Sequence, residues 1–139
     1  MSRQLAMISL LVHEYDEAIH FFTRALRFTL LEDLPLGGAK RWVVVSPGPG
    51  GASLLLARAS DEAQRAAVGH QSGGRVFLFL HTEDLEADMR HMQSHGVRFA
   101  EAPRDEAYGR VVVFLDLFGN RWDLIQPLVP LPSSEGETR

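Results

Sequence analysis

The fold is decided by residues 114–126, FLDLFGNRWDLIQ. An apolar run at 111–115 and a second run at 121–126 flank Gly119 and Asn120, residues that tolerate positive φ, and this pattern is typical of a β-hairpin. Asp123 stands between Trp122 and Leu124, so the two-residue period of a strand places its carboxylate on the opposite face from both. This carboxylate therefore lies either on a solvated face or in a cavity where it does chemistry.

The composition is that of an ordinary globular protein of single-domain size, with 139 residues, 45% of them apolar and 23% charged. The net charge of -4 and the scattered Lys and Arg argue against a nucleic-acid partner or an anionic membrane surface. The absence of cysteine excludes disulfides, thiol nucleophiles and thiolate metal sites. No leader-like start and no apolar run near the roughly 18 residues that span a bilayer are present, so a cytoplasmic location is expected.

Changes of hydrophobic period divide the chain into strands and helices. The run at 5–12 is almost continuously apolar, whereas apolar residues from 14 onward recur at three- and four-residue steps. Residues 100–109, AEAPRDEAYG, indicate an irregular connection. The expected strands are 5–12, 28–34, 41–46, 52–57, 76–82, 97–100, 110–115 and 121–126, and the expected helices are 14–26, 61–68 and 84–95.

The two halves of this pattern repeat each other. A shift of roughly 70 residues brings Ile19 onto Met89 in the same helical frame, and a shift of about 68 brings Leu55 onto Asp123. We therefore expect one domain over 1–127, made of two βαβββ units at about 1–68 and 70–127. The Pro-, Ser- and charge-rich residues 128–139 are predicted to be a flexible tail.

The expected fold class is α+β. Each βαβββ unit has one apolar sheet face and one covering helix, and two such units complete their burial by forming a curved mixed sheet. The concave side of that sheet is a trough, which is the natural place for a ligand pocket.

At this point the sequence resembles the vicinal oxygen chelate superfamily, which includes glyoxalase I, bleomycin-resistance proteins and extradiol dioxygenases. The resemblance rests on VHEYDEAIHFFTRAL, on LHTEDLEADMRHMQSHGV and on the closing FLDLFGNRWDLIQ, and it covers residues 5–126. It implies the glyoxalase/bleomycin-resistance/dioxygenase fold and a homodimer. It does not imply one activity, because the family includes isomerases, ring-cleaving oxygenases and metal-free drug binders.

The resemblance also implies where a metal ion would bind. Metal-dependent members carry ligands on the first and last strands of each unit, and these positions correspond to Met7, Leu55, Phe77 and Asp123. Only Asp123 offers a donor that a hard or borderline divalent ion accepts. No metal and no other cofactor is therefore expected, although a divalent metal held by atypical ligands remains an alternative.

The same positions predict a ligand pocket. Asp123 would lie on its floor, as a hydrogen-bond acceptor or general base, with a pKa raised by burial above the ordinary value of about 3.9. A solvated strand carboxylate is the alternative. The predicted pocket residues are Met7, Trp42, Leu55, Phe77, Phe79, His81, Glu101 and Asp123, and Asp123 is the one catalytic candidate.

Three functions are compatible with these residues. The first is metal-free binding of a small apolar or aromatic molecule, which the apolar side chains at Met7, Leu55 and Phe77 favour. The second is an enzyme, a lyase, isomerase or dioxygenase that uses Asp123 with an unusually held metal. The third is a structural homodimer without a pocket. No partner other than a small molecule and a second copy is expected.

Overall fold

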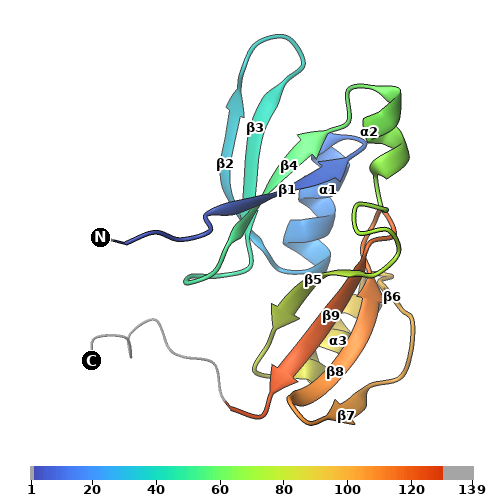
Figure 1. The fold of residues 1–139 in the computed structure, drawn as a ribbon. Helices are drawn as coiled ribbons and strands as arrows, with labels where there is room; N and C mark the ends of the chain where they lie inside the picture. The colour runs from blue at the N-terminus through green and yellow to red at the C-terminus, as the bar shows by residue number, and fades with distance from the viewer. Residues whose placement is uncertain (1, 130–139) are drawn as a thin grey trace. The chain divides into compact units, whose positions relative to one another are not determined.

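A computed structural model describes residues 2–129 of the protein. The chain divides into two compact units, Met1–Gly69 and a second unit that begins at His70. Each unit contains its own sheet and at least one helix (Figure 1). The α+β class expected from the hydrophobic periods is confirmed.

The first unit is a four-stranded mixed sheet with its helices. The strand order is β1-β4-β3-β2, in which β1 runs parallel to β4 and the other neighbours run antiparallel. Its elements are β1 (Met7–Val12), α1 (Tyr15–His20), the π-helical η1 (Phe21–Ala25), β2 (Thr29–Pro35), β3 (Arg41–Ser46), β4 (Ser53–Arg58) and α2 (Glu62–Ala67).

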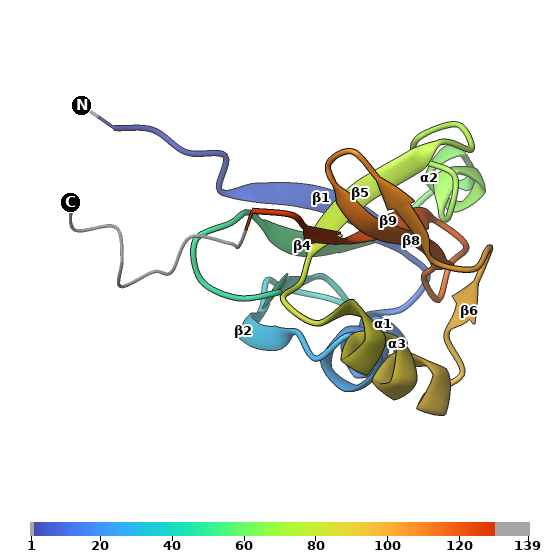
Figure 2. The ribbon, with the colours of Figure 1, turned by 90° about the horizontal axis from the view of Figure 1, so that it is seen from below.

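One face of this sheet is buried beneath α1 and η1 (Figure 2). Leu10 of β1 and Leu56 of β4 pair with each other and point toward this face, where both are almost completely buried. Phe22 of η1 is fully buried in the same core. Because side chains alternate along a strand, Leu55 points to the opposite, open face of the sheet. That open face is where a ligand can reach the strands.

The first helix departs from the prediction of one continuous α-helix over 14–26. In the structure α1 is followed by a π-helical turn over Phe21–Ala25, in which the N–H of Leu26 donates to the carbonyl of Phe21 at 3.4 Å. The wider turn leaves Phe22 fully buried, with its ring edge-on to that of Phe21. The hydrophobic period does not distinguish such a π-helical turn from an α-helical one.

The second unit repeats the topology of the first. The strand order is β5-β9-β8-β6, with β5 parallel to β9 and with β7 also paired to β8. The helix α3 covers one face of this sheet (Figure 1). Its elements are β5 (Val76–His81), α3 (Leu85–Ser94), β6 (Arg98–Phe99), β7 (Arg104–Glu106), β8 (Gly109–Leu115) and β9 (Arg121–Pro127).

The pairing registers show the repeat directly. In the first unit the parallel partner of Leu55 is Ser9, and in the second unit the parallel partner of Asp123 is Phe79. The shifts of roughly 70 and 68 residues predicted from the sequence relate these two pairs. Leu55 and Asp123 therefore hold equivalent positions in their own sheets.

Part of the predicted irregular connection at 100–109 is a strand. Residues Arg104–Glu106 form β7, in which Arg104 pairs with Val111 and Asp105 pairs with Arg110. The prediction was wrong there because the polar run Arg-Asp-Glu has no apolar alternation, while the pairing depends on the backbone of β8. The strand predicted at 97–100 is also shorter, since β6 covers only Arg98–Phe99.

A buried carboxylate closes the turn between β8 and β9. Asp116 is 3% exposed, and its Oδ1 accepts hydrogen bonds from the N–H groups of Phe118 and Asn120 at 2.9 and 3.0 Å. Its Oδ2 accepts from Asn120 Nδ2 and from Trp122 Nε1, both at 3.0 Å. Gly119 supplies the positive φ of the turn, at 99°. The hairpin predicted from FLDLFGNRWDLIQ is confirmed.

The predicted tail at 128–139 falls mostly outside the described residues. Leu128 and Val129 are exposed, and the N–H of Leu128 donates to the carbonyl of Tyr108 at 3.2 Å. Residues 130–139 lie outside the described part of the chain. Within residues 2–129, every helix is too short or too polar to cross a membrane.

Candidate functional site

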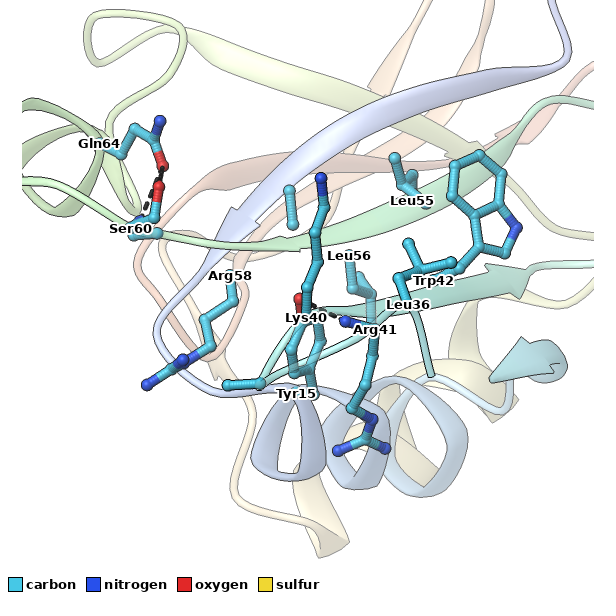
Figure 3. A pocket seen from close by; sticks show the side chains of 13 residues that line it. Tyr15, Leu36, Lys40, Arg41, Trp42, Leu55, Leu56, Arg58, Ser60 and Gln64 are labelled. Atoms are coloured by element: carbon cyan, nitrogen blue, oxygen red, sulfur yellow. Dashed lines mark hydrogen bonds between the residues drawn. The ribbon is translucent and has the colours of Figure 1, made fainter. Parts of the chain in front are cut away.

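The first unit contains a pocket where β3 and β4 separate. The ladder between them has two register pairs, Val44 with Leu55 and Val45 with Leu54. Nearer Arg41 the two strands diverge, and a pocket of about 570 Å³ opens between them. It is lined by Tyr15, Leu36, residues 39–42, residues 55–60 and Gln64 (Figure 3). A volume of this size is within the range of roughly 300–1,000 Å³ typical of small-molecule sites.

Tyr15 supports the β3 side of the pocket. The N–H of Arg41 donates to the phenolic oxygen of Tyr15 at 3.1 Å, so a side chain from α1 satisfies a strand amide where the ladder has ended. The guanidinium of Arg41 lies over the Tyr15 ring, with 5.0 Å between Cζ and the ring centroid. Since Tyr15 is only 7% exposed, this contact fixes the start of β3 on α1.

The charge of Arg41 is compensated on the helix side of the sheet. Its guanidinium pairs with Asp33 at 2.8 Å and with Asp16 at 2.9 Å. Hydrogen bonds to Asp33 and then to Asp16 raise the pKa of Arg41 above its usual value. The same contact with Arg41 lowers the pKa of Asp33, so this ion pair stays charged. Arg41 therefore anchors the hairpin that borders the pocket.

Trp42 presents its ring to the pocket. It is half-buried, and its Nε1–H donates to Glu32 Oε1 at 3.2 Å. This hydrogen bond uses the only donor of the indole and fixes the orientation of the ring. An aromatic face with its polar edge already satisfied suits contact with another flat apolar group.

The remaining wall is shaped by the start of α2. Asp61 caps this helix by accepting from the N–H of Gln64 at 2.7 Å. Gln64 Oε1 in turn accepts from the N–H and the hydroxyl of Ser60, at 2.8 and 3.0 Å, which is close to a capping box. Arg58, at the end of β4, pairs with Glu14 at 3.1 Å. Local capping therefore holds the polar end of the pocket in place.

The second unit holds the acidic candidate, Asp123. It is 7% exposed in the middle of β9, and its Oδ1 has no hydrogen-bond partner within the described residues. Burial raises the pKa of Asp123, the nearby charge of Arg104 lowers it in part, and the charge of Glu101 raises it. Arg104 also pairs with Glu101 and, at 2.6 Å, with Glu106, so its charge is shared between these two carboxylates.

Comparisons with known proteins fit this repeated βαβββ architecture. The family model of the Glyoxalase/Bleomycin resistance protein/Dioxygenase superfamily matches residues 4–124. The chain belongs to this superfamily. A protein of Shewanella frigidimarina (strain NCIMB 400) is 51% identical over 128 residues, covering 91% of this chain and 95% of its own length.

Solved structures of the superfamily fold agree. TnmS3, an antibiotic binding protein from Streptomyces sp. CB03234, is 30% identical, with a TM-score of 0.72 over 91% of this chain and 97% of its own. UcmS2 is 26% identical, with a TM-score of 0.77 over 90% of this chain and 98% of its own. The family recognised from the sequence is thus confirmed.

The structure places the predicted pocket residues in both units of this superfamily fold. Trp42 and Leu55 line the pocket of the first unit, whereas Met7 lies at the exposed beginning of β1, outside the lining. The other predicted residues belong to the second unit: Phe77, Phe79 and His81 on β5, Asp123 on β9, and Glu101 before β7. Their role in a pocket, and the trough between the units, stay predictions.

Several pocket residues were missed by the sequence analysis. Tyr15 belongs to the apolar stripe of the first helix and was interpreted as core. Gln64 and Arg58 showed no local pattern that indicates a pocket. The spacing of Ser60, Asp61 and Gln64 at the start of a helix was the one available signal for that wall, and it indicates capping rather than binding.

The family metal pattern does not fit the side chains of this protein. Of the four predicted ligand positions, Met7, Leu55, Phe77 and Asp123, only Asp123 is a strong donor for a divalent ion. The strand partners of Leu55 and Asp123, which are Ser9 and Phe79, add no strong donor. Within residues 2–129, no three His, Asp or Glu side chains are grouped so that they could hold an ion. The donor set therefore argues against the metal site of the metal-dependent family members.

Asp123→Asn is expected to raise the free energy of unfolding at pH 7.5 by about 1 kcal/mol, because it removes a buried charge whose Oδ1 has no partner within the described residues. Since burial raises the pKa of Asp123, the folded protein holds this proton more tightly than the unfolded chain. Protonation of Asp123 makes its full contribution to the free energy of unfolding at pH values below the pKa of this residue in the unfolded chain. The contribution is lost as the pH rises through the pKa of Asp123 in the folded protein. The gain from the variant should therefore vanish at pH 3.

Urea unfolding of both proteins at pH 3 and pH 7.5 measures this difference. The exposed Asp105→Asn serves as the matched control and should show no gain at pH 7.5, because the Asp105 side chain is 81% exposed. An equal gain from Asp123→Asn at both pH values would contradict the assignment to a buried carboxylate.

Proposed function

We propose that this protein binds a small apolar or aromatic molecule in the pocket of residues 1–69, and that binding needs no metal ion. The observation that carries the proposal is the pocket itself, with the fixed, half-buried face of Trp42 on one side and Leu55 and Ala57 on the other. Rigid aromatic and aliphatic walls favour a flat apolar ligand. TnmS3, at 30% identity, is an antibiotic binding protein, which supports a small-molecule binding function.

The side chains that define this pocket are held before any ligand arrives. Trp42 is fixed by Glu32, the start of β3 by Tyr15, and the Ser60 segment by Gln64. A preorganised site loses little conformational entropy on binding. This arrangement favours a binding function over a role in assembly alone.

Trp42→Ala is expected to weaken the binding of a neutral aromatic probe, 2-naphthamide, by about twentyfold, because buried aromatic side chains are typical binding hot spots. Isothermal titration calorimetry on protein dialysed against a chelator measures the affinity. The control is Leu31→Ala, which truncates an exposed side chain, 54% accessible, of the same unit outside the pocket lining.

The titration also locates the site. We expect the chelator to leave the affinity unchanged. Absence of naphthamide binding, or a loss of affinity on chelation, would contradict the proposal. A loss in Phe79→Ala with no loss in Trp42→Ala would contradict the assignment of binding to this pocket, because Phe79 belongs to the second unit.

A second candidate is an enzyme in which Asp123 is a general base. It is favoured by one observation, a buried carboxylate with a raised pKa and an Oδ1 that has no partner within the described residues. In that case Asp123→Asn would abolish turnover while leaving Trp42-dependent binding intact. An activity screen that finds no Asp123-dependent turnover removes this candidate.

We also propose that the protein forms a homodimer, as the family resemblance implies. Light scattering of the purified protein measures its mass, and a monomer at the concentrations used for binding would contradict it.

A further inference from the structure

We propose that the pocket selects molecules that carry both an aromatic ring and a negatively charged group, with Lys40 binding the anion and Trp42 the ring. This inference rests on the proposed function, since it specifies the ligand class of the same pocket. Lys40 is the only lysine in the sequence, and it stands in the pocket lining.

Lys40 is the cation of the lining whose charge is not compensated. Three lining residues are cationic, and two of them are paired: Arg41 with Asp16 and Asp33, and Arg58 with Glu14. The ammonium of Lys40 makes no ion pair with any residue in 2–129, and no Asp or Glu belongs to the lining. A ligand carboxylate would therefore meet an available partner, whereas a ligand ammonium would meet no opposite charge among the lining residues.

The geometry places the ammonium and the indole on the same side of the chain. Lys40 immediately precedes β3 and Trp42 is the second residue of that strand, so their Cα atoms are about 7 Å apart. Figure 3 shows the Lys40 side chain extending across the pocket in the direction opposite to the Arg41 guanidinium. A ring that stacks on Trp42 can therefore hold an acidic substituent toward Lys40.

The hydrogen bond of Trp42 gives the ligand one orientation. The indole Nε1–H is already donated to Glu32, so this edge of the ring carries a carboxylate and offers no donor to a second anion. An anionic group is repelled at the Glu32 edge and attracted toward Lys40. The two charges together align a molecule that is aromatic at one end and acidic at the other.

Three matched probes test the inference: 2-naphthoate, 2-naphthamide and 2-(aminomethyl)naphthalene, titrated into the full chain at pH 7.5 and low salt. We expect 2-naphthoate to bind about fivefold more tightly than the amide, which is the scale of a solvent-accessible ion pair, and the amine to bind most weakly. The advantage of the carboxylate should disappear at high salt, while the affinity for the amide changes little.

The variants separate charge from shape. Lys40→Gln should reduce the affinity for 2-naphthoate to that for the amide, and Lys40→Arg should retain the preference. Arg65→Gln is the control, because it makes the same charge change at an exposed site in α2 outside the pocket lining. A general effect of net charge would appear equally in Arg65→Gln, and that outcome would overturn the proposal.

The single lysine permits a direct readout. Reductive methylation with ¹³C-formaldehyde labels Lys40 and the N-terminal amine alone, and the methylated lysine keeps its charge. The Lys40 signal should shift on addition of 2-naphthoate and much less with the amide. Equal binding of acid and amide overturns this inference while the proposed function stands, whereas no binding of any probe overturns both.

Discussion

Asp116→Ala is expected to lower the free energy of unfolding by about 3 to 4 kcal/mol, among the largest effects of any single substitution in this chain. The carboxylate is 3% exposed and accepts four hydrogen bonds, two on each oxygen. Its removal leaves buried donors on Asn120 and Trp122 without this acceptor. An unsatisfied buried donor costs more than the net gain of the bond it loses.

Urea unfolding followed by tryptophan fluorescence measures the loss, because the indole of Trp122 is itself a donor to Asp116. Asp116→Asn is expected to cost roughly half as much, since one oxygen and its two acceptor positions remain. The control is Asp105→Ala on β7, where the side chain is 81% exposed and pairs only with a surface arginine, at an expected cost below about 1 kcal/mol. An effect of Asp116→Ala as small as that of Asp105→Ala would contradict the role assigned to this turn.

This prediction separates the two aspartates of the closing stretch FLDLFGNRWDLIQ. Both carboxylate oxygens of Asp116 accept two hydrogen bonds from residues of the same hairpin, so the role of Asp116 is structural. Asp123, on β9, has an oxygen with no partner within the described residues and a raised pKa, and its role in chemistry stays a prediction.

The topology could be predicted from the sequence because the local spacing of apolar residues indicates each strand and helix. The apolar run of β1, the helical stripe that contains Tyr15 and Ala18, and the alternation around Asp123 each specify one element and one buried face. The repeat then shows which element of one unit corresponds to which element of the other. The alternation predicted the face of Asp123 but not its partner on β5, which the structure shows to be Phe79 and not the predicted first-strand position Phe77.

The pocket could not be predicted in this way, because it depends on where a ladder ends. The strands β3 and β4 pair at Val44 and Val45 and then diverge. At that point the phenolic oxygen of Tyr15 accepts the hydrogen bond from the N–H of Arg41. No local pattern in 41–46 or 53–58 reports this divergence, since both runs have ordinary strand composition. Trp42 and Leu55 were predicted to line a pocket, but the family resemblance suggested a different set of neighbours.

The second large effect is expected at Gly109, the first residue of β8, where Gly109→Ala should cost about 3 kcal/mol. Its φ of +150° is rarely adopted by residues with a side chain. A Cβ built there would lie 2.4 Å from the carbonyl oxygen of Gln126 and 2.9 Å from the Cα of Pro127, and backbone atoms of a paired strand cannot move aside independently. Gln126 also accepts from the N–H of Leu85 at 2.9 Å through its side chain, so a shift of β9 would disturb the start of α3.

Three glycine-to-alanine variants separate the cost of backbone strain from the cost of steric collision. Gly51→Ala should be neutral, because its φ is not positive and no atom lies within 4 Å of the added Cβ. Gly96→Ala, at a φ of +80° with open space around it, should cost about 1 kcal/mol from backbone strain alone. Gly109→Ala combines strain with collision and should therefore exceed both. Equal losses in Gly96→Ala and Gly109→Ala would show that the contact with Gln126 relaxes freely, and would contradict the rigid register that holds Asp123 at the centre of its sheet.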